Sequence, residues 1–284
     1  MASVKMTRAG GEVDPERRLG ELVAERPARA RLFERLHLDY CCGGQQTLVE
    51  ACAKQSLELG SVRAAIAALD EAASEPDGCE LTDWRSVPIE QLCEHIVSAH
   101  HDALRQAFPR VDTLMATVIR VHGDADPRLQ EVEHAYGRIR SALEPHLGSE
   151  ETDLFPAIVA AAHGGAPVPA STLTEHEHEH ADVGAALARL RVLCHDYERP
   201  RAHCNTHRAL LDALEDLELD LHRHVHEENN ILFARAREAH APAEDTGSAG
   251  SRRADTPPEA AQPLPSCCQG WIAEQSHRWA AHRR

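Results

Sequence analysis

Two His-x-x-x-Glu motifs place the strongest constraint on how this chain can fold. Residues four apart lie on one face of an α-helix, about 6 Å from each other. His146–Glu150 and His224–Glu228 can therefore each hold a metal ion if both segments are helical. Each motif runs into an apolar segment, residues 154–156 (LFP) and 231–233 (ILF). The matched pattern predicts equivalent positions in two helices that face one core.

The competing interpretation of a single His-x-x-x-Glu motif is a surface ion pair. Two copies with matched apolar runs favour a metal site, and further histidines among the 20 in the chain strengthen that reading, namely His101, His122, His176, His178 and His180. Mixed imidazole and carboxylate ligation suits iron, although zinc or manganese could enter such a site. Asn229 and Asn230 could orient ligands, cap a helix or lie at the surface.

Composition excludes several other classes of protein. The chain is 42% hydrophobic but only 4% aromatic, which favours an all-α fold. It has no run of about 18 apolar residues, so we expect no membrane span. The net charge of -16 argues against a nucleic-acid partner. The N-terminus lacks an apolar signal core, which predicts a cytoplasmic protein. In a reducing cytoplasm we expect the nine cysteines of the chain to be free thiols or redox groups.

The chain divides into three predicted regions joined by a linker. Residues 14–72 carry short helical patterns and form a small helical domain. Residues 74–86 contain Pro, Gly and Asp together and read as the linker. Residues 87–239 read as long amphipathic helices. Residues 241–284 form a tail that we expect to be mostly disordered, because its first part is rich in Pro, Ala and Gly.

Helix breakers set the number of long helices in residues 87–239. The first helix starts near Pro88 and is interrupted at Pro109. Residues 122–127 and 163–170 are loops, and Arg199-Pro200 is a turn. Four main helices with short connections predict an up-down four-helix bundle.

At this point the sequence resembles a known family. Residues 89–238 resemble a hemerythrin-like (HHE) bundle, and residues 14–70, with LDYCCGG at 38–44, resemble the N-terminal domain of the iron–sulfur cluster repair di-iron proteins of the RIC or ScdA type. The resemblance implies two iron ions in an oxo- and carboxylate-bridged non-haem centre. Carried over residue by residue, it implies seven ligands, with the two glutamates as bridges: His101, His122, His146, Glu150, His180, His224 and Glu228.

Two of these assignments depend on helix geometry. In one straight helix His101 and His122 would lie about 31 Å apart, so they can share a metal pair only if the chain turns sharply near Pro109. We expect that turn; otherwise one of the two is not a ligand. In the HEHEH segment His176 and His180 share a face and His178 does not. His180 is preferred because the following Gly184 matches the family pattern, and His176 stays open as an additional or orienting residue.

Cys41 and Cys42 precede two glycines that permit a sharp turn, which can leave both thiols accessible. The alternative is that one thiol is buried and inert. The resemblance implies that this pair takes part in redox, metal or nitric-oxide transfer with the di-iron centre. A second pair, Cys267 and Cys268, is either a tethered thiol pair that reaches the centre or an unrelated extension.

The resemblance implies repair of iron–sulfur clusters damaged by oxidative or nitrosative stress, by iron donation or by nitric-oxide processing. The expected partners are damaged iron–sulfur proteins and nitric oxide or oxygen.

The alternative functions are a hemerythrin-like oxygen or nitric-oxide sensor or carrier, and a di-iron oxidase or peroxidase. Oxygen carriers of this type end in an Asp five residues after the last His, whereas Glu228 is four after His224. Whether the protein is an enzyme stays open, and a homodimer is compatible with the sequence.

Overall fold

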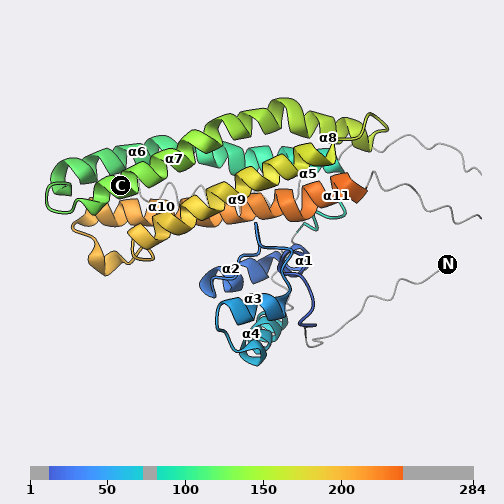
Figure 1. Cartoon of the computed structure of the whole chain (residues 1–284), viewed down its shortest axis with the longest axis horizontal. Helices are drawn as coiled ribbons and strands as arrows, with labels where there is room; N and C mark the ends of the chain where they lie inside the picture. The colour runs from blue at the N-terminus through green and yellow to red at the C-terminus, as the bar shows by residue number, and fades with distance from the viewer. Residues whose placement is uncertain (1–12, 73–81, 239–284) are drawn as a thin grey trace, which may run out of the picture.

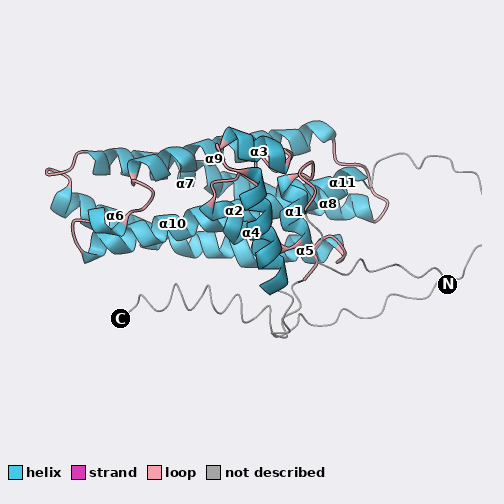
Figure 2. Ribbon diagram, turned by 90° about the horizontal axis from the view of Figure 1, so that it is seen from below, coloured by secondary structure: helices cyan, strands magenta, loops and turns pink. Residues whose placement is uncertain are grey.

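The computed structural model describes residues 13–72 and 82–238, and within these ranges every named element is a helix. The all-α prediction is confirmed. Figure 1 shows a long helical bundle with a smaller group of helices packed against one side, and Figure 2 shows the same small group from below. Most of the predicted linker and the tail at 241–284, including Cys267 and Cys268, lie outside the described residues.

The bundle consists of four antiparallel rods, three of which are helices continued through a π-helical turn. The first rod comprises α5 (Ile89–Ile96), η2 (Val97–His101) and α6 (Asp102–His122), and the second comprises α7 (Arg128–Ser149), η3 (Glu150–Leu154) and α8 (Phe155–Ala162). The third is α9 (Ala170–Leu193), and the fourth comprises α10 (Asn205–His226), η5 (Glu227–Leu232) and α11 (Phe233–Glu238). Short connections make successive rods antiparallel, as in the predicted up-down bundle.

The three π-helical turns lie where the histidine and glutamate motifs occur. Such turns are rare, appear mostly as single turns inside α-helices, and concentrate at functional sites. The turn η2 ends at His101, η3 begins at Glu150, and η5 contains Glu228. The rods are therefore irregular at the level of the bundle where these histidines and glutamates face inward.

The predicted break at Pro109 is wrong, because α6 runs unbroken from Asp102 to His122 with Pro109 inside it. A proline in a helix interior removes one backbone hydrogen bond, here to the carbonyl of Arg105, and costs about 3 kcal/mol. Arg105 and Pro109 both lie on the exposed side, where water can hydrate the freed carbonyl. Phe108 and Val111 are buried in the bundle core, and their packing outweighs the local cost.

The smaller group of helices has a core of its own, formed around Phe33, Tyr40, Leu48 and Ile66. Its elements are α1 (Leu19–Glu25), η1 (Pro27–Arg29), α2 (Ala30–Arg35), α3 (Leu48–Lys54) and α4 (Leu59–Ala72). A capping box between Thr47 and Glu50 starts α3.

Asn230 on η5 fastens this small group to the bundle. Its Nδ2 donates hydrogen bonds to the carbonyl oxygens of Tyr40, at 3.3 Å, and Cys41, at 3.0 Å. Gly20 and Gly44 make room for the Asn230 side chain, since a Cβ at either position would lie within 2.4 Å of Asn230 Oδ1. The segment that carries the cysteine pair is thereby held against the bundle.

We predict that Gly44→Ala destabilises this contact. The added Cβ would lie 2.4 Å from Asn230 Oδ1 and 2.7 Å from the carbonyl oxygen of Tyr40. Overpacking of this kind costs about 1–3 kcal/mol, measured as the free energy of unfolding in urea. Gly137→Ala is the control, because nothing lies within 4 Å of its added Cβ and helix propensity should stabilise it by about 0.5–1 kcal/mol. Equal effects of the two substitutions would contradict the packing described here.

Candidate metal centre

Two groups of buried donor atoms lie side by side at the level of the π-helical turns. The first comprises His101, Glu150, His224 and Glu228, and the second comprises His146, Glu150, His180 and Glu228. Within each group the donor atoms all lie within 4.8 Å of one another. Each of the four rods contributes at least one of the six side chains, and none is more than 8% exposed.

The two carboxylates belong to both groups, and each directs one oxygen to each. Glu150 Oε2 lies 3.5 Å from His101 Nε2, while its Oε1 lies 3.0 Å from His146 Nε2. Glu228 Oε1 lies 3.0 Å from His224 Nε2, while its Oε2 lies 3.2 Å from His180 Nε2. Carboxylates placed in this way can bridge two cations.

The donor atoms fit bound cations better than they fit one another. His101 Nε2 lies 3.1 Å from His224 Nε2, and His146 Nε2 lies 2.9 Å from His180 Nε2, so unprotonated ring nitrogens would face each other. Both oxygens of Glu150 and Oε2 of Glu228 are buried without a hydrogen-bond partner. Leaving buried charged groups unpaired is costly. Cations between the lone pairs would satisfy these atoms.

The charges within the cluster are strongly coupled. Burial alone would raise the pKa of Glu228, but His224, His101 and His180 outweigh it and hold the pKa well below its usual range. Burial and the charge of Glu228 oppose ionisation of Glu150, yet His146 and its neighbours still lower its pKa. Both carboxylates are therefore ionised at neutral pH, the form that binds a metal ion.

Three of the four histidines are held in place through their second ring nitrogen. Nδ1 of His101 lies 2.7 Å from Glu151, Nδ1 of His146 lies 2.7 Å from Glu179, and Nδ1 of His180 lies 2.8 Å from Asn229 Oδ1. Such partners fix the ring and its tautomer, so that Nε2 faces the metal. Asn229 was among the residues expected to orient ligands, whereas Glu151 and Glu179 were not, although each stands directly beside a predicted ligand.

His176 lies at the edge of the second group. Its Nδ1 is 3.6 Å from Glu150 Oε1, and its ring centroid is 5.1 Å from that of His146. This nitrogen is buried without a hydrogen-bond partner. His176 can therefore approach a cation in the second group, as the sequence left open.

The structure does not bring His122 to this cluster. Because α6 is continuous, His122 lies at its far end, where Nε2 is 3.2 Å from Cys204 Sγ and the ring stacks on His203. His122 was carried over from the resemblance on the condition that the chain turned at Pro109, and that condition fails. Six of the seven predicted ligands meet, and His122 does not.

Comparison with known proteins agrees with this geometry. The model of the hemerythrin HHE cation binding domain matches residues 93–236, and a domain of unknown function named for the ScdA N-terminus matches residues 15–70. The chain belongs to the hemerythrin HHE family. Relatives called iron-sulfur cluster repair protein YtfE match most of this chain and almost all of their own length. That of Pectobacterium carotovorum subsp. carotovorum (strain PC1) is 34% identical over 218 residues, which cover 77% of this chain and 95% of the relative. That of Edwardsiella ictaluri (strain 93-146) is 36% identical over 221 residues, which cover 78% and 96%.

In this hemerythrin HHE protein the cysteine pair lies against α9, beside the second group. Cys42 Sγ is 3.4 Å from the carbonyl oxygen of His180, in a space that Gly184 leaves open. Cys41 is buried, and Cys42 is partly exposed. The hydrogen bond between the thiols raises the pKa of Cys41, with burial adding to the effect, and lowers the pKa of Cys42. Cys42 is therefore the more reactive thiol.

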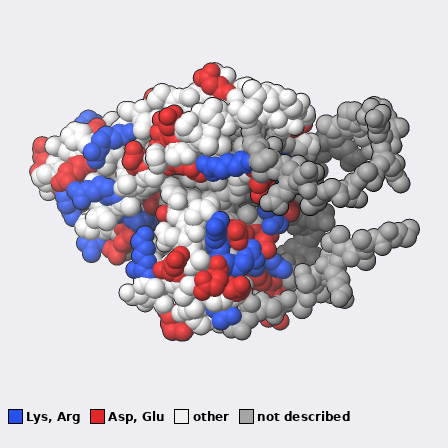
Figure 3. All heavy atoms as spheres, turned by 45° about the vertical axis from the view of Figure 1, so that its right-hand side comes forward, with Lys and Arg blue, Asp and Glu red and all other residues white. Residues whose placement is uncertain are grey.

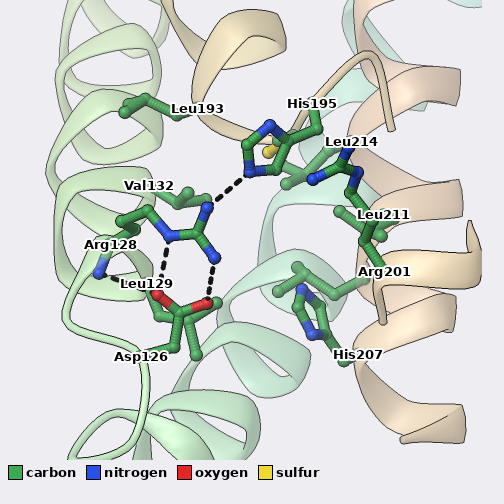
Figure 4. A pocket seen from close by; sticks show the side chains of 12 residues that line it. Asp126, Arg128, Leu129, Val132, Leu193, His195, Arg201, His207, Leu211 and Leu214 are labelled. Atoms are coloured by element: carbon green, nitrogen blue, oxygen red, sulfur yellow. Dashed lines mark hydrogen bonds and ion pairs between the residues drawn. The ribbon is translucent and has the colours of Figure 1, made fainter. Parts of the chain in front are cut away.

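A small pocket lies at the opposite end of the bundle (Figure 4). Asp126 pairs there with Arg128, which also contacts His195, and His207 and Leu214 line the other side. Its volume of about 40 Å³ has room for no more than a few water molecules. It is too small for an organic substrate.

The face that Figure 3 presents carries charges of both signs. Acidic and basic side chains are interspersed there, without an extended basic patch of the kind that contacts phosphates. No helix within residues 13–72 and 82–238 has the length and apolar character needed to cross a membrane.

We predict that removing the bound metal lowers the melting temperature. Buried glutamates left without counter-charges cost about 3–5 kcal/mol, which corresponds to a shift on the order of 10 °C for a domain of this size. Calorimetry before and after chelation, with metal content verified, measures the shift. Reloading should restore the original value, and Glu228→Gln should respond less. An unchanged melting temperature after complete removal would contradict the proposed site.

We also predict that His122→Gln leaves the metal content unchanged, because His122 contacts Cys204 at the other end of the bundle. His101→Gln removes a donor from the first group and should lower metal content, measured by elemental analysis. The reverse result would show that α6 is broken in solution.

Proposed function

We propose that the chain binds two iron ions in this cluster and takes part in the repair of iron–sulfur clusters damaged by oxidative or nitrosative stress. The observation that carries the proposal is the sharing of Glu150 and Glu228 between the two donor groups. In the proposed centre, His101 and His224 would hold one iron and His146 and His180 would hold the other. The names of the relatives support the assignment to repair.

The ligand types favour iron among the available metals. Each group offers two imidazole nitrogens and two carboxylate oxygens. Iron accepts such a mixed set, whereas calcium prefers oxygen ligands alone and structural zinc sites are rich in thiolates. When bound, the two irons would supply a redox-active centre that can meet nitric oxide or oxygen, or that can give up an ion.

The protein's own residues hold this centre in a buried, water-poor environment. Glu151, Glu179 and Asn229 orient the histidine rings. Phe155 and Phe233 stack on His101 and His180, with ring centroids 5.7 and 6.0 Å apart, and cover the cluster on the side of α8 and α11. Small molecules such as nitric oxide can reach such a site more easily than larger oxidants.

In this proposal Cys41 and Cys42 are the thiols that connect the centre with a damaged iron–sulfur protein. Their support is geometric: Cys42 lies over the backbone of His180 while it stays partly exposed. A partner that docks on the small helical group would therefore meet a thiol next to the di-iron centre. A homodimer and a cytoplasmic location stay predictions from the sequence.

The central test is restoration of a damaged cluster enzyme. We expect protein purified without oxygen to contain two irons per chain and to reactivate a hydratase whose [4Fe–4S] cluster has been treated with nitric oxide. Glu150→Leu and Glu228→Leu should lose iron and activity together, because each removes a donor from both groups. His122→Gln is the matched control. A stable, reversible oxygen adduct without reactivation would favour the carrier instead.

The cysteine role is tested separately. We predict that Cys42→Ser keeps two irons but reactivates the damaged hydratase more slowly, because the thiol lies beside His180 without entering either donor group. Cys204→Ser is the control, a partly exposed cysteine at the far end of the bundle. If both serine variants reactivate the enzyme at the native rate, the cysteine pair has no part in repair.

A further inference from the structure

A third group of metal-binding side chains lies beside the di-iron cluster and shares none of its residues. It consists of His95 on α5, His100 on η2 and Glu227 on η5. Glu227 Oε2 lies 3.2 Å from His95 Nε2 and 3.4 Å from His100 Nε2. All three donor atoms lie within 4.8 Å of one another.

Neighbouring side chains hold both imidazoles in the orientation that a metal requires. Asp220 Oδ1 lies 3.0 Å from His100 Nδ1, so this carboxylate accepts a hydrogen bond from Nδ1–H and directs Nε2 towards Glu227. Trp84 stacks on the ring of His95, with centroids 3.9 Å apart and planes 23° from parallel. A carboxylate on the outer nitrogen of a histidine is the usual support of a metal ligand.

The donor atoms in this group lack other partners. His100 Nε2 and Glu227 Oε2 are buried and have no hydrogen bond of acceptable geometry. The side chain of His100 is fully buried, and that of Glu227 is 14% exposed. Buried polar atoms without partners are uncommon in folded proteins. Because they converge on one point, a single cation there could satisfy them.

We propose that His95, His100 and Glu227 bind one divalent first-row cation, Fe²⁺ before others, at a site separate from the di-iron cluster. Two imidazoles and one carboxylate, with the remaining positions open to water, form the ligand set of many non-haem ferrous sites. With only three protein ligands, this ion should be bound less firmly than the two irons that share Glu150 and Glu228. The negative charges of Asp220 and Glu227 offset its repulsion from the neighbouring irons.

The position of this site suggests its role. The ring of His100 stacks on that of His224, with centroids 5.4 Å apart and planes 5° from parallel. The His95 side chain is 10% exposed and the His224 side chain is 1% exposed. The third site therefore lies between solvent and the first iron, where an ion entering or leaving the cluster would pass. This transit role, unlike the site itself, rests on the proposed function in iron supply.

The test counts iron bound by the full-length protein. Protein that already holds two irons is dialysed without oxygen against excess Fe²⁺, and the iron per chain is measured against the buffer. We expect three irons in the native chain and two in His95→Gln. His163→Gln is the matched control, because that histidine lies 3.7 Å from Glu90 with a side chain that is 65% exposed. Glu227→Gln is the second variant.

A native chain that saturates at two irons, or a third iron that persists in His95→Gln, overturns the proposal. In either case the three residues form an imidazole–carboxylate network that only positions His224 and Glu228. A slower loss of iron to a ferrous chelator in His95→Gln would support the transit role, and an unchanged rate would refute that role alone. If the native chain holds fewer than two irons before dialysis, the di-iron proposal fails. Dialysis against Mn²⁺ then decides the third site by itself, with one ion fewer expected in His95→Gln.

Discussion

The rest of the structure depends on the contacts of two glutamates at the centre of the bundle, Glu150 and Glu228. Each glutamate contacts both pairs of histidines. A carboxylate this deeply buried is stable only if nearby positive charge replaces its lost hydration. Here four imidazoles from four rods surround two such groups. In this arrangement a deeply buried polar region is also the point at which all four rods must meet.

The rods adapt to this requirement through their π-helical turns. In a regular α-helix the residues on one face recur every 3.6 positions. The apolar residues of the cores on either side of the cluster follow that spacing. An extra residue in η2, η3 and η5 changes the spacing locally, so that charged side chains face inward without disturbing the apolar pattern further along. Inserting a wider turn allows polar and apolar layers to alternate within one rod.

Much of this organisation could be predicted from the sequence, and the exceptions have physical causes. The His-x-x-x-Glu motifs and the loops at 122–127 and 163–170 depend on local spacing, which a sequence displays directly. His122 could not be excluded in this way, because whether Pro109 breaks its helix depends on the packing of Phe108 and Val111 in the core. Contacts between rods are likewise invisible to local patterns. Glu179 on α9 supports His146 on α7, and the local pattern does not show which of the two glutamates in the HEHEH segment faces α7.

The turn η5 has a consequence beyond its own geometry. Four successive side chains on it make separate contacts: Glu227 with His95 and His100, Glu228 with the donors of the cluster, Asn229 with the outer nitrogen of His180, and Asn230 with the backbone of the cysteine segment. These connections cannot move independently, because they share one stretch of backbone. Through this turn, a carboxylate of the centre and the side chain that holds the cysteine segment stand two residues apart on one piece of backbone, so the small helical group is anchored at the level of the cluster and not elsewhere along the fourth rod.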